Sequence, residues 1–357
     1  MKSLVIGYNH PAKDKRVMRT VAALKKLGIV YYQFSGSAMP IEEEDLHYFA
    51  IEKQFMQGHF SLQKRRNFDK RILGLIRNTN CDLIYFHGFP SSMPLKVFKF
   101  ARKMGKKIIY DLHEIMPVHF LPEKLSFLSP LMWHILRAQL KIVNGVVGVS
   151  DEATEMMLDK VRINIRALTV QNYAKCAVSL SESDVKKNEI IVVGLTNRNF
   201  CINDRLLKTL KNDFRIVSIG AHCDFADEEL PFMEYESMME RLSKAKFTLL
   251  AHHSRSDLNF ANDIYSLPNK FFDSLAAGTP VILAKRFISM KRMIDETNTG
   301  VVLNLIEDAD EDLRKLQNAL DHYDEYIENL KIHKDEFVWD ESKEAVFKDF
   351  VLSIMKS

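Results

Sequence analysis

The sequence has few cysteines and no long apolar run. The four thiols, Cys81, Cys176, Cys201 and Cys223, are far apart, with no C-x-x-C pair and no metal-ligand spacing. This usage is typical of reduced thiols in an intracellular protein and excludes a disulfide framework. Because no run of about 18 apolar residues occurs, we expect no membrane-spanning helix.

Other absences narrow the function further. The N-terminal stretch MKSLVIGYNHPAKDKR has no small-residue cleavage site and does not resemble a signal peptide, so we expect a cytoplasmic protein. The net charge of +3 is too small to indicate a nucleic-acid partner. Neither a phosphate-binding G-x-x-x-x-G-K-[ST] loop nor a G-x-G-x-x-G motif is present. The acidic run around Asp308 and Asp310 is typical of a solvated helix start, so we expect no bound metal.

What the sequence contains is a regular alternation of short apolar runs and helical patterns. A chain of 357 residues is long for one core, so two domains are expected. Strands alternating with helices favour mostly parallel sheets covered on both faces. The strand candidates of the first half are 3–8, 29–34, 82–88, 106–114 and 143–150, and those of the second half are 189–194, 214–220, 245–253, 279–284 and 300–305.

A polar, Ser- and Lys-rich stretch from Lys175 to Glu189 separates the two halves and is interpreted as a linker. The predicted fold is α/β, with two Rossmann-like doubly wound domains that face each other across a cleft. We place the first domain at 1–175, completed by the terminal helix at 340–357, and the second at 185–338. In such sheets, ligands bind at the carboxyl ends of the strands.

The segment DIYSLPNKFFDSLAAGTPVILAK, residues 263–285, predicts a short helix that ends at Gly278 and continues into a buried strand. Ser266 is a candidate cap, and Pro268 suits the first turn. The helix N-terminus and Lys270 could bind an anion, and Asp273 follows three residues later on the same face. A nucleotide site would use both features. The alternative is a capped surface helix with a solvated Lys/Asp pair, and spacing alone does not decide between them.

The same segment resembles the nucleotide-sugar region of GT-B glycosyltransferases, particularly the retaining glycosyltransferase family 4. Other segments resemble this family in the same order, and together they cover most of the chain. They are HPAKDKRVMRTVAALKKLG, IIYDLHEIMP, VNGVVGVSDEATEMM, LTVQNYAK, VVGLTNRNF and MEYESMMERLSKAKFTLLAHH. The resemblance implies a GT-B fold and transfer of a sugar from a nucleotide-sugar donor.

The resemblance also implies roles for single residues. Asp273 stands where the family has the second glutamate of its E-x7-E motif, which binds the ribose hydroxyls. The first glutamate falls at Tyr265, with Asp263 two residues earlier, so this half of the motif is missing or displaced. The missing glutamate affects the contacts expected with the donor sugar and not the expected nucleotide site.

The donor diphosphate would be held by basic residues and the helix start. Arg198 resembles the residue that binds the pyrophosphate in the family, and Lys270 replaces a lysine that the family often has shortly after it, with Arg255 as a further candidate. Asn269, Ser266 and Tyr265 complete the expected nucleotide site. The resemblance implies a retaining reaction, and the lack of an evident protein nucleophile fits one in which the acceptor attacks the face that the diphosphate leaves. Because no metal motif is evident, we expect a metal-independent reaction whose leaving-group charge falls to Arg198, Lys270 and helix N–H groups.

In the first half, His113 of the YDLHE segment is expected to hydrogen-bond the donor sugar or the acceptor, and a loop histidine without function is the alternative. Asp111 and Glu114 are interpreted as supports rather than catalysts. His10 and Asp14 are weaker candidates for acceptor contact. Tyr235, at a helix start in the second half, could pack near the base or belong to the core.

A basic amphipathic segment, QKRRNFDKRILGLIRN at 63–78, could lie on an anionic membrane surface. The commoner structure for such a segment is a helix that packs its apolar side and leaves its charges in solvent.

The sequence therefore predicts a glycosyltransferase with a nucleotide-sugar donor, UDP- or GDP-linked, and a carbohydrate or lipid-linked acceptor of a cell-surface polysaccharide or glycolipid. A nucleotide-sugar 2-epimerase of the same fold, which needs no acceptor, is one alternative. A two-domain α/β protein that binds a small molecule without catalysis is the other. The sequence names neither the sugar nor the base.

Overall fold

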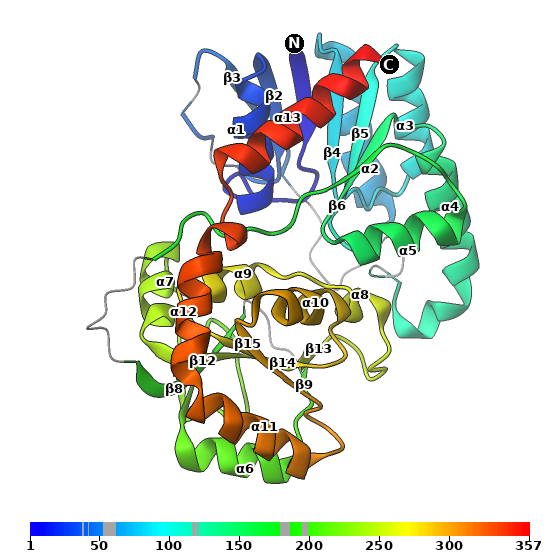
Figure 1. Cartoon of the computed structure of the whole chain (residues 1–357). Helices are drawn as coiled ribbons and strands as arrows, with labels where there is room; N and C mark the ends of the chain where they lie inside the picture. The colour runs from blue at the N-terminus through cyan, green and yellow to red at the C-terminus, as the bar shows by residue number, and fades with distance from the viewer. Residues whose placement is uncertain are drawn as a thin grey trace. The chain divides into compact units, whose positions relative to one another are not determined.

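The structure is a computed structural model that describes residues 1–37, 39–41, 43–52, 62–115, 119, 121–178, 186–194 and 199–357. It consists of two compact units (Figure 1). Unit 1 comprises Met1–Val170 together with Glu341–Ser357, and unit 2 comprises Gln171–Asp340. The chain thus leaves unit 1 a few residues before the expected boundary at 175 and returns to it at the start of the terminal helix.

Unit 1 is built on a parallel seven-stranded sheet with the order β3-β2-β1-β4-β5-β6-β7. Its strands are β1 Lys2–Ile6, β2 Ile29–Phe34, β3 Leu46–Ala50, β4 Leu83–His87, β5 Lys107–Leu112, β6 Gly145–Gly148 and β7 Ala167–Thr169. The order reverses between β1 and β4. Such a reversal opens a crevice at the carboxyl ends of the strands, where doubly wound folds bind ligands.

Helices connect these strands, as parallel pairing requires. They are α1 Lys15–Lys25, α2 Leu62–Asn78, α3 Pro94–Lys103, α4 Ser129–Leu140, α5 Asp151–Val161 and the 3-10 segment η2 Glu123–Leu128. Asp14 caps α1 by accepting hydrogen bonds from the backbone N–H groups of Arg16 and Val17, both at 3.0 Å. Ser150 caps α5 in the same manner.

The last helix, α13 (Glu341–Lys356), packs on unit 1 although the whole of unit 2 lies between it and the rest of unit 1 in sequence (Figure 1). Its Ile354 and Phe350 lie so close to Gly145 of β6 that a Cβ atom there would be 2.8 Å from Ile354 Cδ1. Glu344 forms an ion pair with Lys26 at 2.7 Å. These contacts make the terminal helix an integral layer of unit 1.

Unit 2 repeats the same plan in a parallel six-stranded sheet of order β11-β10-β8-β12-β14-β15. Its strands are β8 Lys187–Val193, β10 Arg215–Ile219, β11 Glu228–Leu230, β12 Ala245–Leu250, β14 Val281–Ala284 and β15 Gly300–Leu303, and the two-residue strands β9 Asn199–Phe200 and β13 His252–His253 pair separately. Both units therefore have the strand order of the Rossmann fold.

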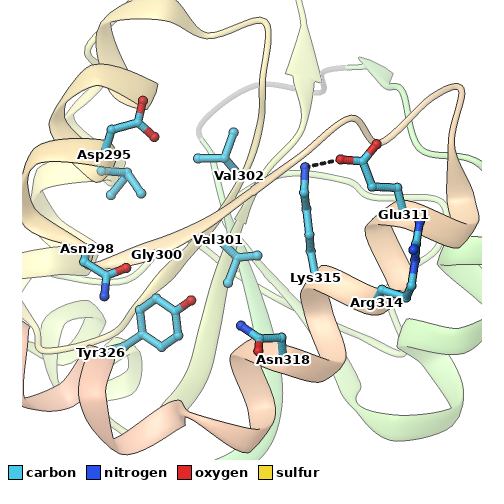
Figure 2. Close-up of a pocket in the computed structure, with 11 residues that line it drawn as sticks. Asp295, Asn298, Gly300, Val301, Val302, Glu311, Arg314, Lys315, Asn318 and Tyr326 are labelled. Carbon is cyan, nitrogen blue, oxygen red and sulfur yellow. Dashed lines mark ion pairs between the residues drawn. The ribbon is translucent and has the colours of Figure 1, made fainter.

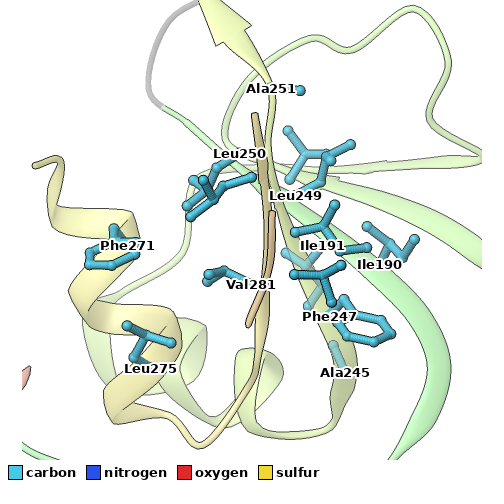
Figure 3. Packing of buried hydrophobic residues seen from close by; sticks show 14 of the residues in the cluster. Ile190, Ile191, Ala245, Phe247, Leu249, Leu250, Ala251, Phe271, Leu275 and Val281 are labelled. Carbon is cyan, nitrogen blue, oxygen red and sulfur yellow. The ribbon is translucent and has the colours of Figure 1, made fainter. Parts of the chain in front are cut away.

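The helices of unit 2 pack apolar faces against this sheet. They are α6 Asp204–Asp213, α7 Tyr235–Ser243, α8 Ala261–Ile264, α9 Asn269–Ala276, α10 Ile288–Thr297, α11 Ala309–Asp321, α12 Tyr323–His333 and the 3-10 segment η3 Lys334–Phe337. Figure 3 shows Phe271 and Leu275 of α9 directed at Leu250 of β12 and Val281 of β14. All four side chains are fully buried, and this packing fixes α9 on the sheet.

The expected α/β class with two Rossmann-like units is confirmed. Every expected strand is present, although β3, β9 and β11 were not expected. β9 has two residues, and β11 has three, of which two are glutamate, so neither has the apolar run by which buried strands are recognised. β3 lies at the edge of its sheet. Within the described ranges, no helix is long and apolar enough to cross a membrane.

Candidate functional site

Unit 2 contains a cavity of about 410 Å³ at the carboxyl ends of β8 and β10. A volume of this size is in the range of small-molecule sites. The backbone after β8, the start of α7 and the first turns of α9 form its walls. The lining residues are Val193, Gly194, Ile219, Phe232, Met233, Tyr235, Met238, Pro268, Asn269, Lys270 and Asp273. Three of the residues expected from sequence, Asn269, Lys270 and Asp273, thus meet in one cavity.

The start of α9 differs from the expectation. The N-cap is Pro268, with extended backbone angles, and it makes no side-chain capping bond within the described structure. The Ser266 hydroxyl instead donates to the Asp263 carbonyl oxygen at 2.9 Å. The prediction that Ser266 caps the helix is therefore wrong, because Pro268 shifts the helix start to Asn269. The N-terminal turn faces the cavity, and the helix dipole there favours an anion.

Lys270 and Asp273 are buried, with 9% and 4% of their surface exposed. The alternative of a solvated surface pair is excluded, since both side chains line the cavity. Burying a charged pair costs free energy unless protein groups or a bound ligand provide hydrogen bonds or opposite charge. The burial and the position of these residues make them the core of the candidate site.

Tyr235 holds the Asp273 carboxylate in place. The Tyr235 hydroxyl donates to Asp273 Oδ1 at 3.0 Å and accepts the backbone N–H of Lys175 at 3.1 Å. Burial, and next to it the Asp273 charge, raise the pKa of Tyr235 above its ordinary range, so the phenol stays protonated and remains a donor. Tyr235 is thus both a wall of the cavity and the support of Asp273.

Two further residues expected at the nucleotide site, Tyr265 and Ser266, do not line the cavity. The backbone carbonyl of Tyr265 accepts the Ser289 hydroxyl at 3.3 Å. Asp263 is 2% exposed and accepts hydrogen bonds from the backbone N–H and the hydroxyl of Ser254, at 2.7 and 2.6 Å. Its carboxylate therefore holds the loop after β13, and Asp263 does not line this cavity.

The expected diphosphate residue Arg198 lies outside the described residues. Arg255, the further basic candidate, places its guanidinium 4.0 Å from the centre of the Phe260 ring, and it does not line the cavity. Of the expected cations, the structure brings Lys270 alone to the described part of the site.

Unit 1 brings three histidines together at the carboxyl ends of β1, β4 and β5, where its strand order reverses. His113 Nδ1 lies 3.1 Å from His10 Nε2, and His113 Nε2 lies 2.9 Å from His87 Nδ1. The three rings thus form a chain with His113 in the middle. Both ring nitrogens of His113 are engaged, so its expected direct contact with a sugar would require one of these bonds to break.

Asp111 lies beside His87 and His113 and is 1% exposed. It forms an ion pair with Arg16 at 2.7 Å and accepts the Tyr85 hydroxyl at 3.0 Å. Burial opposes its ionisation, but Arg16, His113 and His87 together outweigh burial and hold the pKa of the Asp111 carboxyl far below its usual range. Burial also lowers the pKa of His113 well below its ordinary value, so this ring is neutral at neutral pH.

Sequence reasoning did not find His87. Its signal was its place at the end of β4, where it pairs in register with Asp111 of β5. His87, Asp111 and His113 also place their ligand atoms within 4.8 Å of one another, a spacing compatible with a metal ion, although the sequence suggested no such cluster. Asp14, a weaker candidate for acceptor contact, is the cap of α1.

A second hollow, of about 770 Å³, follows the edge strand β15 between α10 and the helices α11 and α12 (Figure 2). Figure 2 shows Lys315 directed at Glu311, and the two side chains form an ion pair at 2.6 Å. Its other polar walls include Asp295, Asn298 and Tyr326. No residue expected from sequence lines it, and we do not assign it to the site.

The basic segment forms helix α2, whose apolar side belongs to the core of unit 1. Phe68, Ile72 and Ile76 are at most 3% exposed. Lys70 and Arg71 are exposed. The apolar side is therefore committed to packing, and a contact of α2 with a membrane would have to be electrostatic.

The chain resembles known proteins in two ways. Residues 15–172 match the family model for Glycosyltransferase Family 4. Several solved structures share the fold over nearly the whole chain. Sucrose-phosphate synthase from Thermosynechococcus elongatus is 12% identical with a TM-score of 0.66, over 100% of this chain and 99% of that chain. No curated protein sequence matches the chain.

Two further structures extend the comparison. HepE of Anabaena, in complex with UDP, is 11% identical with a TM-score of 0.64, over 99% of this chain and 100% of that chain. WaaG, a glycosyltransferase involved in lipopolysaccharide biosynthesis, is 11% identical with a TM-score of 0.61, over 98% of this chain and 99% of that chain. At such identities the likeness to solved structures shows the fold, which is GT-B. With the family match, it makes the protein a glycosyltransferase of the GT-B type.

Proposed function

We propose that the protein transfers a sugar from a nucleotide diphosphate sugar to a hydroxyl of a carbohydrate or lipid-linked acceptor, with retention of configuration and without a metal ion. One observation carries the proposal: buried Lys270 and Asp273 line a cavity together with the N-terminal turn of α9. This arrangement offers a cation and helix N–H groups to a diphosphate and a carboxylate to hydroxyl groups.

The cavity provides a separate place for each part of a nucleotide. The diphosphate would lie at the start of α9 beside Lys270, where charge and dipole act together. Asp273, three residues later, would accept hydrogen bonds from the ribose hydroxyls. The apolar walls, formed by Phe232, Met233 and Met238, would cover the base. Tyr235 keeps Asp273 oriented for this contact.

The proposed chemistry relies on electrostatic stabilisation of the leaving diphosphate. Lys270 and the N-terminal turn of α9 would stabilise the charge that develops as the glycosidic bond breaks. The acceptor would attack from the face that the diphosphate leaves, which retains configuration without a protein nucleophile. Retention is checked by the anomeric configuration of the product in NMR. Loss of transfer in EDTA, with recovery on adding manganese or magnesium, would contradict the metal-free reaction.

We propose a UDP-sugar as donor, with a GDP-sugar as the alternative. The fold relative HepE was solved with UDP, which supports this choice. A thermal-shift screen with UDP, GDP, ADP, CMP and their sugars tests it, and the expected result is a selective shift with UDP. Release of UDP that depends on an added acceptor would support transfer. Conversion of the donor to another nucleotide sugar without acceptor would indicate an epimerase, and binding without turnover would indicate a binding protein.

We propose an acceptor from a cell-surface polysaccharide or glycolipid and a cytoplasmic enzyme that contacts anionic membranes through α2. The relative WaaG acts in lipopolysaccharide biosynthesis, and α2 exposes Lys70 and Arg71 above its buried side. Each basic residue near an anionic surface contributes about 1 kcal/mol. Sedimentation with phosphatidylserine vesicles should therefore fall as salt rises. No sedimentation at low salt would leave α2 as a packing helix only.

A further inference from the structure

The three histidines of unit 1 form a chain whose protons can be counted. Each of the two contacts, at 3.1 and 2.9 Å, is of hydrogen-bond length and therefore contains one proton. In their neutral forms the three imidazoles carry three protons, and the third must then lie on an outer nitrogen, either His10 Nδ1 or His87 Nε2. Only two arrangements satisfy both contacts: all three rings protonated on Nδ1, or all three on Nε2.

Asp111 distinguishes the two arrangements. Its Oδ2 lies 3.3 Å from His87 Nδ1, and its Oδ1 lies 3.7 Å from His113 Nε2. A carboxylate favours a proton on the nearer nitrogen and repels a bare lone pair there. His87 Nδ1 therefore carries a proton, His113 Nδ1 donates to His10 Nε2, and His10 carries its own proton on Nδ1.

The outer end of the chain is His10. His10 Nδ1 and His87 Nε2 are buried atoms with no hydrogen-bond partner in the described part of the chain. His87 is fully buried in β4, whereas His10 is partly exposed in the loop after β1, at the carboxyl edge where doubly wound sheets bind ligands. A buried polar nitrogen without a partner in such a place indicates a group that a ligand completes.

We propose that His10 Nδ1–H is the ligand-facing group of the three histidines and donates a hydrogen bond to an oxygen of the acceptor sugar. His87 and His113 are positioning residues: Asp111 fixes the tautomer of His87, and the two hydrogen bonds between the rings then fix the tautomers of His113 and His10. The assignment rests on the proposed function and replaces a direct sugar contact by His113. A His10 that carries its proton on Nδ1 acts as a donor and does not remove a proton from the acceptor.

The first test needs no variant and no substrate. Nitrogen NMR of the full-length protein with ¹⁵N-labelled histidine reports the tautomer of each ring. The expected result at neutral pH is that His10, His87 and His113 are all protonated on Nδ1. Protonation on Nε2, doubly protonated rings, or one zinc ion bound per chain with shifted signals for His87 and His113 would each overturn the proposal.

The second test uses the covalent geometry of amide side chains. An asparagine places its amide at the position of His Nδ1, and a glutamine places it at that of Nε2. Because Nδ1 is the working nitrogen at both ends of the chain, His10→Asn and His87→Asn should each retain about three- to tenfold more kcat/KM for the acceptor than the corresponding glutamine variants. His134, exposed on α4, provides the matched control pair, for which asparagine and glutamine should be equal.

The opposite order at His10, with glutamine better than asparagine, would show that only the contact to His113 matters and would overturn the proposal. Should His87 variants fail to fold, the His10 pair and the NMR measurement still decide. Calorimetry of the parent with UDP and GDP tests the proposed function separately from the histidine tautomers. Failure to bind either nucleotide would refute the proposed function. The tautomer result would stand or fall independently.

Discussion

The Tyr235 hydroxyl donates a hydrogen bond to Asp273 Oδ1 at 3.0 Å, so the carboxylate proposed to bind the ribose is already oriented by a buried partner. One face of Asp273 is thus committed to the fold while the residue also lines the cavity. Because of this double role, we expect a variant of Tyr235 to change mainly the stability of the fold and a variant of Asp273 to change the binding of the nucleotide.

Tyr235→Phe removes the donor and leaves a buried carboxylate with one partner fewer. A hydrogen bond to a charged group contributes about 1.5–3 kcal/mol, and the free energy of unfolding should fall by this amount. Urea denaturation measures it. An unchanged unfolding midpoint would show that the contact contributes nothing.

Asp273→Ala should weaken UDP binding by about 1.5–3 kcal/mol, because the ribose hydroxyls lose a charged acceptor. Calorimetry with UDP and its 2′,3′-dideoxy analogue gives the specific test. The parent and Tyr235→Phe should distinguish the two ligands, whereas Asp273→Ala should not. If Asp273→Ala still discriminates as well as the parent, the residue does not contact the ribose.

Lys270→Ala should weaken UDP binding about tenfold to a hundredfold and leave uridine binding nearly unchanged, since the lysine is proposed to contact only the diphosphate. Lys285→Ala is the matched control, because Lys285 is an exposed lysine that follows β14, the next strand after α9. Equal losses for UDP and uridine would mean that Lys270 supports the cavity rather than the diphosphate.

Gly88→Ala should destabilise unit 1. Gly88 has φ +38°, and a Cβ atom there would lie 3.4 Å from His113 Cγ and 3.6 Å from His10 Cε1. A side chain in this backbone region costs about 1–2 kcal/mol. Gly74→Ala, in α2 with no atom within 4 Å of the added Cβ, should instead stabilise by about 0.5–1 kcal/mol. Thermal unfolding of the two variants should therefore shift in opposite directions.

Stability should fall as the pH drops below about 6.5. Burial lowers the pKa of His113 and of His10 from 6.5, so the unfolded chain takes up protons in this range while the folded chain does not. Stability is then complete above pH 6.5 and decreases by about 1.4 kcal/mol per pH unit for each such histidine. His113→Gln should flatten this dependence in urea titrations at pH 7 and pH 5. A slope equal to that of the parent would contradict the assignment.

The sequence predicted what depends on local periodicity. A helical spacing of three places Lys270 and Asp273 on one face of the expected helix, and the family resemblance suggested their roles. The helix forms, although it begins at Asn269. Ser266 was misassigned because the extended backbone of Pro268, with ψ 154°, delays the helix start, and no residue pattern shows this.

Groups that meet through the sheet were beyond sequence reasoning. His87 and His113 are 26 residues apart and become partners only because β4 and β5 pair in register. Asp263 illustrates the reverse case, since it stands near the position of a sugar-binding glutamate but turns to the Ser254 loop. The chemical role of each carboxylate depended on its partner, and only the fold determines that partner.

The placement of α13 has a consequence for how the protein forms during synthesis. Unit 1 needs residues 341–357, whereas unit 2 is one continuous stretch of chain. At about 5–20 residues per second, the ribosome requires roughly 10–30 s to make the intervening segment. During this time β6 has no helix over Gly145, and the apolar surface that Ile354 and Phe350 later cover is open to water. Unit 2, although second in the sequence, can thus complete its fold first, whereas unit 1 becomes complete only when residues 341–357 have been made.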